Sequence, residues 1–191
     1  MGKTNKHVAL IVGPNSEMEA QAIRSALEYF QIRVTTYWIG RPRDLIEVLT
    51  GEGLMSETDC LILSFHGEEG ELLMPVLEES VYELDEPRGN FGSEEIKVFG
   101  NLADRLVIGN GCTLGRPDLA KAFLAQGCRA YIGPGDYIDG NAALYFIIRF
   151  FYELISNGKS EKEAYDLAKS TDNETWLYEW YSSEKVLGFS K

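Results

Sequence analysis

The 191-residue chain contains 30 acidic and 18 basic residues, which gives a formal net charge of −12 at pH 7. This charge argues against nucleic-acid partners and anionic membrane surfaces, because both are bound mainly through clustered Lys and Arg side chains. A hydrophobic share of 45% is typical of a packed core, and the length fits one α/β domain over residues 1–191 better than two.

Three cysteines, Cys60, Cys112 and Cys128, cannot all pair within the chain, and their spacing matches no zinc-binding pattern. Free thiols indicate a reducing compartment, so we expect a cytoplasmic protein. We also expect no metal and no other cofactor. The N-terminus has no apolar signal segment. The most apolar stretch, 142–155, is too short and too charged to span a bilayer.

Strands and helices alternate along most of the chain. Apolar or β-branched runs bounded by turn residues predict strands, and these runs lie at 7–12, 32–38, 60–65, 105–109 and 129–132. Apolar residues at helical spacing, together with capping and turn residues, predict helices at about 16–30, 41–50, 93–102, 117–126, 141–156 and 160–170. This alternation predicts a three-layer α/β/α sandwich around a mainly parallel sheet.

Three local patterns add detail to this outline. Ser16 and Glu19 have the spacing of a capping box at the start of the first helix. Short alternations of apolar and polar residues within 71–84 predict a small hairpin in an insertion after the third strand. The aromatic tail, 175–189, is expected either to pack on the domain or to add a strand.

Two of the predicted strands are followed by residues that can carry chemistry. His66 and Gly67 follow the strand at 60–65, and Cys112 follows the strand at 105–109. Open α/β sheets bind ligands outside the carboxyl ends of their strands. If these two strands are neighbours, about 4.8 Å apart, an imidazole and a thiol lie within reach of each other, which is the minimum equipment of a cysteine nucleophile. The competing interpretation is a buried structural cysteine and a hydrogen-bonded loop histidine.

An ordered set of five motifs resembles the caspase-like cysteine peptidases, most closely the CHAT group, whose relatives include separase. The motifs lie at 64–67, 106–115, 119–133, 139–143 and 151–158. No single motif is diagnostic, whereas the ordered set, which extends from Asp59 to about Lys169, is specific. The resemblance implies a caspase-like fold.

The resemblance also implies a cysteine endopeptidase that uses a Cys–His dyad. Cys112 would attack the scissile carbonyl, and His66 would act in acid–base catalysis. This agrees with thiolate chemistry, because a neighbouring imidazolium favours the ionised nucleophile. The backbone N–H groups of Gly67 and Cys112 would face the developing oxyanion, as in the family.

The same family suggests which residue precedes the cut. In separase-like relatives, an acidic residue after the strand that follows the catalytic cysteine binds a basic substrate residue, and Asp139 matches that position best, with Asp136 close by. Asn110 could bond the same guanidinium group. Asp139 could instead only cap the helix that follows it. The predicted specificity is therefore for a basic residue, Arg above Lys, since a carboxylate pairs with guanidinium through two charge-assisted bonds.

The implied partner is a protein or peptide substrate, and pairing of two copies is one predicted assembly. Two other functions stay open: an inactive interaction module with the same fold, and a flavodoxin- or receiver-like signalling domain. Against the signalling domain, 13–15 lacks the spacing of a phosphate-binding loop. Glu68, Glu69 and Glu71 form either a solvated acidic loop or, as in some caspase-like relatives, a calcium site.

Overall fold

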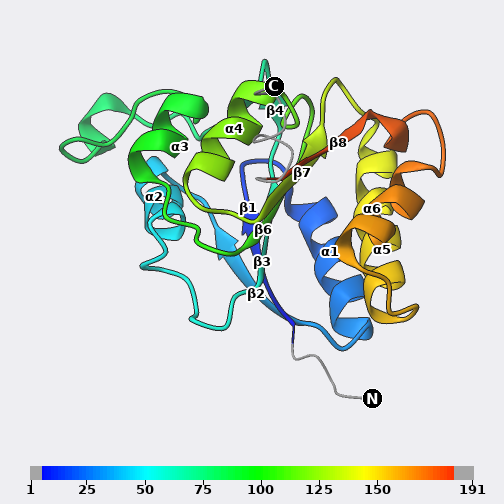
Figure 1. Cartoon of the computed structure of the whole chain (residues 1–191). Helices are drawn as coiled ribbons and strands as arrows, with labels where there is room; N and C mark the ends of the chain where they lie inside the picture. Colours follow the sequence, from blue (N-terminus) through cyan, green and yellow to red (C-terminus); the bar gives the residue numbers. More distant parts are fainter. Residues whose placement is uncertain (1–5, 183–191) are drawn as a thin grey trace, which may run out of the picture.

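Six strands form one sheet in the computed structural model, which describes residues 6–182. Their order is β2-β1-β3-β6-β7-β8 (Figure 1), and every adjacent pair is parallel except β7 with β8. The strands are β1 His7–Val12, β2 Arg33–Trp38, β3 Cys60–Ser64, β6 Leu106–Asn110, β7 Ala130–Pro134 and β8 Tyr178–Ser182. The five strands predicted from the sequence are confirmed, each with ends shifted by at most two residues.

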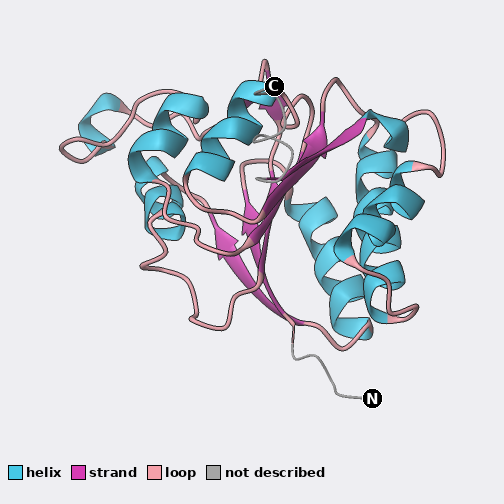
Figure 2. Cartoon of the chain, viewed as in Figure 1, coloured by secondary structure: helices cyan, strands magenta, loops and turns pink. Residues whose placement is uncertain are grey.

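Helices cover both faces of this sheet, as Figure 2 shows. One layer contains α2, α3 and α4, and the other contains α1, α5 and α6 (Figure 1). The helices are α1 Glu17–Tyr29, α2 Pro42–Leu49, α3 Ser93–Phe99, α4 Pro117–Ala125, α5 Gly140–Ile155 and α6 Glu161–Lys169. The predicted three-layer α/β/α sandwich with a mainly parallel sheet is confirmed.

The central strands are buried on both faces because side chains alternate along each strand. In β1, Ala9 and Ile11 pack in the core beneath α2, α3 and α4, whereas Val8 and Leu10 pack in the core beneath α1, α5 and α6. Every residue of β1, β3, β6 and β7 is buried. Each fully buried aliphatic side chain contributes about 1.5–3 kcal/mol, so these four strands hold the two helical layers together.

The aromatic tail adds the last strand, which decides between the two arrangements expected for it. β8 runs antiparallel to β7, with Tyr178 opposite Pro134. The ring of Tyr178 is fully buried and stacks on Phe146 of α5 with 3.6 Å between ring centroids. Residues 183–189 of the predicted tail lie outside the described residues.

The hairpin predicted within 71–84 is wrong. The hairpin lies earlier, where β4, Gly67–Glu68, pairs with β5, Glu71–Leu72. Glu69 and Gly70 at its turn have φ angles of +51° and +85°, and two-residue hairpin loops favour such left-handed values because they match the strand twist. Alternation of apolar residues further along was a weaker signal than this turn.

The insertion after the hairpin is fastened by a buried carboxylate. Glu86 is 3% exposed, and both of its oxygens accept hydrogen bonds from the Arg41 guanidinium, at 3.0 and 2.7 Å. The same carboxylate accepts the backbone N–H groups of Arg43 and Glu83. These bonds, with the Arg41 bond first, lower the pKa of Glu86 to about 2 and join the insertion to the start of α2.

Glu86 should make folding sensitive to acid. Because its folded-state pKa, about 2, lies below the ordinary value of 4.5, its contribution is complete above pH 4.5 and is lost as the pH falls towards 2. We expect the free energy of unfolding to fall more steeply over this window in the wild type than in Glu86→Gln, whose amide does not titrate. Urea denaturation at several pH values measures both slopes, and parallel slopes would contradict the assignment.

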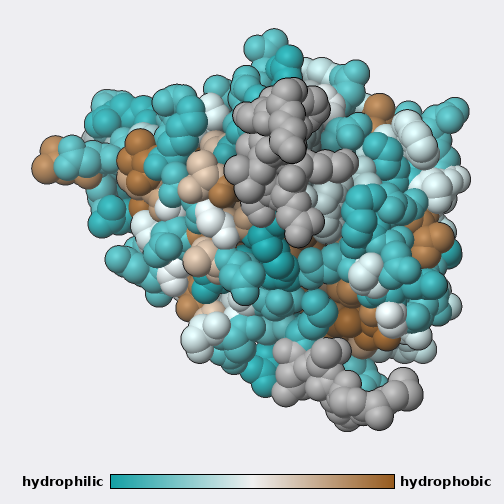
Figure 3. All heavy atoms as spheres, in the orientation of Figure 1, coloured by the Kyte–Doolittle hydropathy of each residue, from teal (hydrophilic) through white to brown (hydrophobic). Residues whose placement is uncertain are grey.

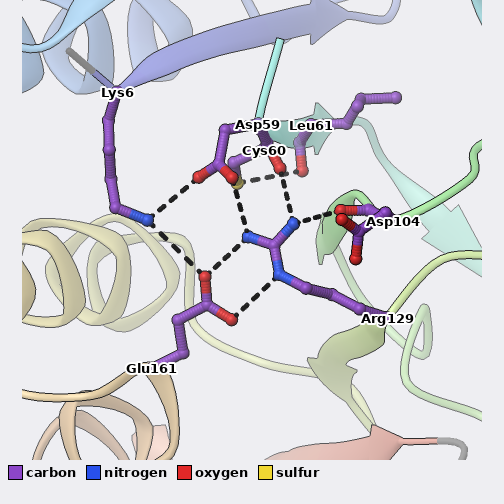
Figure 4. Close-up of polar contacts among 7 residues, drawn as sticks. All are labelled: Lys6, Asp59, Cys60, Leu61, Asp104, Arg129 and Glu161. Carbon is purple, nitrogen blue, oxygen red and sulfur yellow. Dashed lines mark hydrogen bonds and ion pairs between the residues drawn. The ribbon is translucent and has the colours of Figure 1, made fainter. Parts of the chain in front are cut away.

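An ionic network lies at the amino-terminal ends of the strands (Figure 4). Arg129, just before β7, bonds the Glu161 carboxylate at 2.6 Å and the Asp59 carboxylate at 3.2 Å. Its guanidinium also donates to the backbone carbonyl of Asp104. Lys6 lies 2.9 Å from Asp59 and 3.6 Å from Glu161. The network links the starts of β1, β3 and α6 around Arg129.

Replacing the central guanidinium should destabilise the fold. In Arg129→Met, two partly buried carboxylates keep only Lys6 as a cationic partner, so we expect a loss of about 2–3 kcal/mol in the free energy of unfolding. Arg24→Met is the matched control, since Arg24 forms an exposed pair with Glu28 and such pairs contribute less than about 1 kcal/mol. Urea denaturation compares the two variants, and equal small losses would count against a structural role for the network.

Within residues 6–182, no helix has the length and apolar character needed to cross a membrane. Hydrophilic side chains dominate the face of the molecule seen in Figure 3, and hydrophobic atoms appear there in separate small groups. This surface agrees with the high content of charged residues, 25% of the chain.

Candidate active site

His66 and Cys112 follow neighbouring strands. β3 and β6 are parallel, with Ser64 opposite Asn110, so His66 and Cys112 each lie two positions beyond this pair. His66 is exposed and Cys112 is partly exposed. Both line one hollow with a volume of about 750 Å³. The prediction that the two strands are adjacent is confirmed.

Two glycines allow the loops after these strands to come into contact. A Cβ atom on Gly111 would lie 1.9 Å from the carbonyl oxygen of Phe65, and a Cβ atom on Gly67 would lie 2.1 Å from that of Cys112. Real Cβ contacts essentially never fall below 3.0 Å. Any side chain at either position would therefore push the two loops apart.

The turn that carries Cys112 is held in an unusual conformation by its neighbours. Thr113 has a φ of +59°, which is rare for a residue with a branched Cβ atom. Its N–H donates to the carbonyl of Asp136 at 3.0 Å, and its hydroxyl accepts the Gly70 N–H at 3.0 Å. Strained backbone of this kind clusters at functional sites, and here it directly follows the thiol.

The predicted oxyanion donors lie on the same two loops. Gly67 begins β4, and Cys112 lies in the turn after β6. In the part of the chain that the structure describes, the Cys112 N–H donates to no backbone carbonyl. A free N–H group beside a nucleophile suits a developing oxyanion. The oxyanion role of Gly67 and Cys112 stays a prediction.

A carboxylate that the sequence analysis did not select also lines the hollow. Glu19, in the first turn of α1, accepts a hydrogen bond from the Asn110 amide nitrogen at 2.7 Å and one from the Ser64 hydroxyl at 3.3 Å. Burial raises the pKa of Glu19, while these two bonds and the nearby His66 act in the opposite direction. Glu19 thus joins α1 to the ends of β3 and β6.

The predicted capping box at the start of α1 is wrong. Ser16 makes no side-chain capping bond, and Glu19 reaches towards the sheet instead of back to the helix start. A signal for this was present, since Glu19 precedes the buried Ile23 and Leu27 by one and two helical turns. Residues with this spacing share one face of a helix, so the sequence places this carboxylate above the core.

The predicted substrate-binding residue Asn110 faces the hollow but is already hydrogen-bonded. It is 1% exposed. Its amide nitrogen donates to Glu19, and its amide oxygen accepts the Tyr178 hydroxyl at 2.5 Å. The structure therefore places Asn110 in the lining of the hollow that His66 and Cys112 share, hydrogen-bonded to Glu19 and Tyr178.

The two predicted aspartates do not line this hollow, although Asp139 lies between two residues that do, Ile138 and Gly140. Asp139 is exposed and caps α5, accepting the N–H groups of Asn141 at 2.8 Å and Ala142 at 3.3 Å. Asp136 lines a second hollow, of about 240 Å³, together with Thr113. Neither lines the larger hollow that His66 and Cys112 share.

The acidic segment after His66 is exposed. Glu68, Glu69 and Glu71 lie on the hairpin of β4 and β5. Among residues 6–182, no group of three or more His, Cys, Asp or Glu side chains is arranged to hold a metal ion.

The three thiols differ sharply in environment. Cys60 and Cys128 are 2% and 3% exposed. Burial raises the pKa of Cys60 and raises that of Cys128 to about 12. Cys112 lines the hollow, and its thiol donates to the carbonyl of Ile138 at 3.6 Å. Only Cys112 combines access with a histidine in the same hollow.

Together, the sheet order and the position of the hollow define a caspase-like fold, the fold of clan CD cysteine peptidases. The structure is similar to the Arg-specific cysteine proteinase gingipain R, with a TM-score of 0.59 and 12% identity over 90% of this chain. It is also similar to the Saccharomyces cerevisiae separase–securin complex, with a TM-score of 0.56 and 14% identity over 93% of this chain. A secreted C11 cysteine protease from Bacteroides thetaiotaomicron gives a TM-score of 0.56 and 9% identity over 95% of this chain.

This chain corresponds to 45% of the gingipain chain, 12% of the separase chain and 67% of the C11 protease chain. It matches no protein-family model and no curated protein. The caspase-like fold expected from the motifs is thus confirmed. The narrower likeness to the CHAT group stays a prediction.

Brief alkylation should identify the reactive thiol. We expect iodoacetamide at neutral pH to label Cys112 well before Cys60 and Cys128, because burial hinders access to the latter two and disfavours their thiolates. Mass spectrometry of peptides from the folded protein measures the order. The unfolded protein is the control, in which all three cysteines should react alike, and equal labelling in the folded protein would remove the basis for a nucleophilic role.

Proposed function

We propose that this chain is a cysteine endopeptidase that uses Cys112 as the nucleophile and His66 as the acid–base partner. The observation that carries the proposal is the pairing of β3 with β6, because it leads a histidine and an accessible cysteine into one hollow. The caspase-like fold supports it, since the similar structures are described as cysteine proteases.

The proposed reaction has two steps. His66 accepts the thiol proton, and the Cys112 sulfur attacks the carbonyl carbon of the scissile peptide bond. The N–H groups of Gly67 and Cys112 stabilise the negative oxygen that forms. His66 then protonates the leaving amine, and water hydrolyses the thioester to restore the thiol.

The proposed specificity is for a basic residue before the cut. Support comes from Glu19, whose carboxylate lines the hollow and whose two recorded hydrogen-bond donors, on Asn110 and Ser64, are neutral. Each carboxylate oxygen has a further lone pair, so a guanidinium group can bond both. Gingipain R is described as Arg-specific, which is the same chemistry in a protein of similar fold.

The substrate-binding residues predicted from the sequence, Asp139, Asp136 and Asn110, are also part of the proposal. Both capping bonds to Asp139 use one carboxylate oxygen, so its other oxygen can bind a substrate cation. Asp136, in the smaller hollow beside Thr113, is proposed to contact a neighbouring substrate residue. Asn110 is proposed to act through Glu19. β8 forms an outer edge of the sheet, which supports pairing of two copies along this strand.

Cleavage profiling on a peptide library tests the proposal. We expect cleavage after Arg and, more slowly, after Lys, with no detectable cleavage in Cys112→Ala or His66→Ala. In Glu19→Gln, kcat/KM for Arg peptides should fall about 100-fold, since two charge-assisted bonds are weakened. If Asp139 binds the substrate instead, Asp139→Ala should show this loss.

Glu28→Gln is the matched control on the same helix, because Glu28 pairs with Arg24 on the surface. It should leave the profile unchanged. Cleavage after Asp or after large apolar residues would contradict the basic specificity, if neither Glu19→Gln nor Asp139→Ala changes it. A folded protein that cleaves no peptide would instead favour the inactive interaction module.

A further inference from the structure

One buried hydroxyl, that of Tyr178, is linked through Asn110 to Glu19, the carboxylate proposed to bind the basic substrate residue. Tyr178, the first residue of β8, is fully buried, and its ring is parallel to that of Phe146 within 4°. Its hydroxyl donates to the Asn110 amide oxygen at 2.5 Å. Because the stacked ring cannot shift without disturbing α5, the hydroxyl has a fixed position.

This hydroxyl and the Glu19 carboxylate together determine which way the Asn110 amide faces, because an ionised carboxylate only accepts hydrogen bonds. An amide oxygen only accepts and an amide nitrogen only donates. With the oxygen bonded to Tyr178, the nitrogen must face Glu19, where it lies 2.7 Å from the carboxylate. The reverse orientation would set the amide oxygen against the carboxylate, which is repulsive. Burial also raises the pKa of Tyr178, so the hydroxyl keeps the proton that it donates.

We propose that Tyr178 is a positioning residue that orients Asn110 and, through it, holds the Glu19 carboxylate ready for a basic substrate side chain. The part that concerns the substrate rests on the proposed function. The link from Tyr178 to Asn110 does not, since it follows from the hydrogen bonds alone.

The arrangement connects three distant parts of the chain at one point. Asn110 lies 91 residues from Glu19 and 68 residues from Tyr178. β8 therefore does more than extend the sheet. Its Tyr178 positions the Glu19 carboxylate on α1 through Asn110 of β6. Loss of one oxygen atom from β8 should change how the pocket recognises charge.

Tyr178→Phe tests this while keeping the ring stack. We expect KM for an Arg peptide to rise about five- to tenfold with kcat within about twofold, which is the size of one lost hydrogen bond. A matched peptide with Gln before the cut should change by less than about twofold. Tyr165→Phe is the control, since it removes a hydroxyl bond from another largely buried tyrosine, to the carbonyl of Tyr178, and should leave both KM values unchanged.

Two further measurements separate a positioning role from a general loss of structure. In a ¹⁵N–¹H spectrum, the side-chain NH₂ signals of Asn110, identified by their absence in Asn110→Ala, should move in Tyr178→Phe and stay in Tyr165→Phe. In a double-mutant cycle, Tyr178→Phe should add little to the KM of Asn110→Ala. The cycle is informative even if Tyr178→Phe lowers the melting temperature, because each variant is compared as a folded protein.

The outcomes distinguish this inference from the proposed function. If the wild type cleaves no basic peptide, the proposed function fails and the Asn110 signals alone decide whether Tyr178 orients the amide. If the wild type cleaves after Arg, an unchanged Asn110 signal or an unchanged KM in Tyr178→Phe overturns the inference. An equal rise in KM for the Arg and Gln peptides also overturns it, since that would show a structural effect without charge selectivity.

Discussion

The parallel pairing of β3 with β6 is the constraint on which the rest of the site depends. It sets Ser64 opposite Asn110, and from this pair both chains continue into loops that bring His66 and Cys112 to the same hollow. The loops can approach this closely only because Gly67 and Gly111 lack side chains. A shift of one residue in this register would turn the alternating side chains of β3 to the opposite face, which would take Ser64 away from Glu19.

A second constraint is the need to satisfy a partly buried carboxylate. Burial disfavours the charge on Glu19, and an unsatisfied buried polar group is costly. Hydrogen bonds from Asn110 and Ser64 offset that cost, and the Tyr178 hydroxyl holds Asn110 in the one orientation that donates. The hydrogen bonds that Asn110 and Ser64 donate therefore keep Glu19 negatively charged beside the hollow. This charge is the basis of the proposed recognition of a cationic substrate residue. Charged side chains also lie at the amino-terminal ends of the strands. There, however, Arg129 is paired directly with Asp59 and Glu161.

Local sequence signals predicted much of the fold, and their failures have physical reasons. Continuous apolar runs predicted β1, β3, β6 and β7 because these four strands are buried on both faces. The hairpin within 71–84 was wrong because alternation there was weaker than the left-handed turn at Glu69 and Gly70. The capping box was wrong because a glutamate three residues after a serine can also turn towards the sheet, where Glu19 accepts hydrogen bonds from Asn110 and Ser64. Asp139, in contrast, caps its helix as one interpretation of the sequence had it.

By itself, the sequence determined the alternation of strands and helices, the caspase-like resemblance, and the two residues, His66 and Cys112, that are equipped for nucleophilic chemistry. The alternation depends on periodicity along the chain, and the resemblance, which implies the roles of His66 and Cys112, depends on an ordered set of motifs. A single sequence contains both kinds of information directly. Only the tertiary structure decided that their strands are adjacent, that Glu19 shares the hollow, and that β8 supports it through Tyr178. The physical reason is separation along the chain: Glu19 lies 45 residues from Ser64 and 91 from Asn110, and contacts over such distances arise only when the whole sheet has assembled.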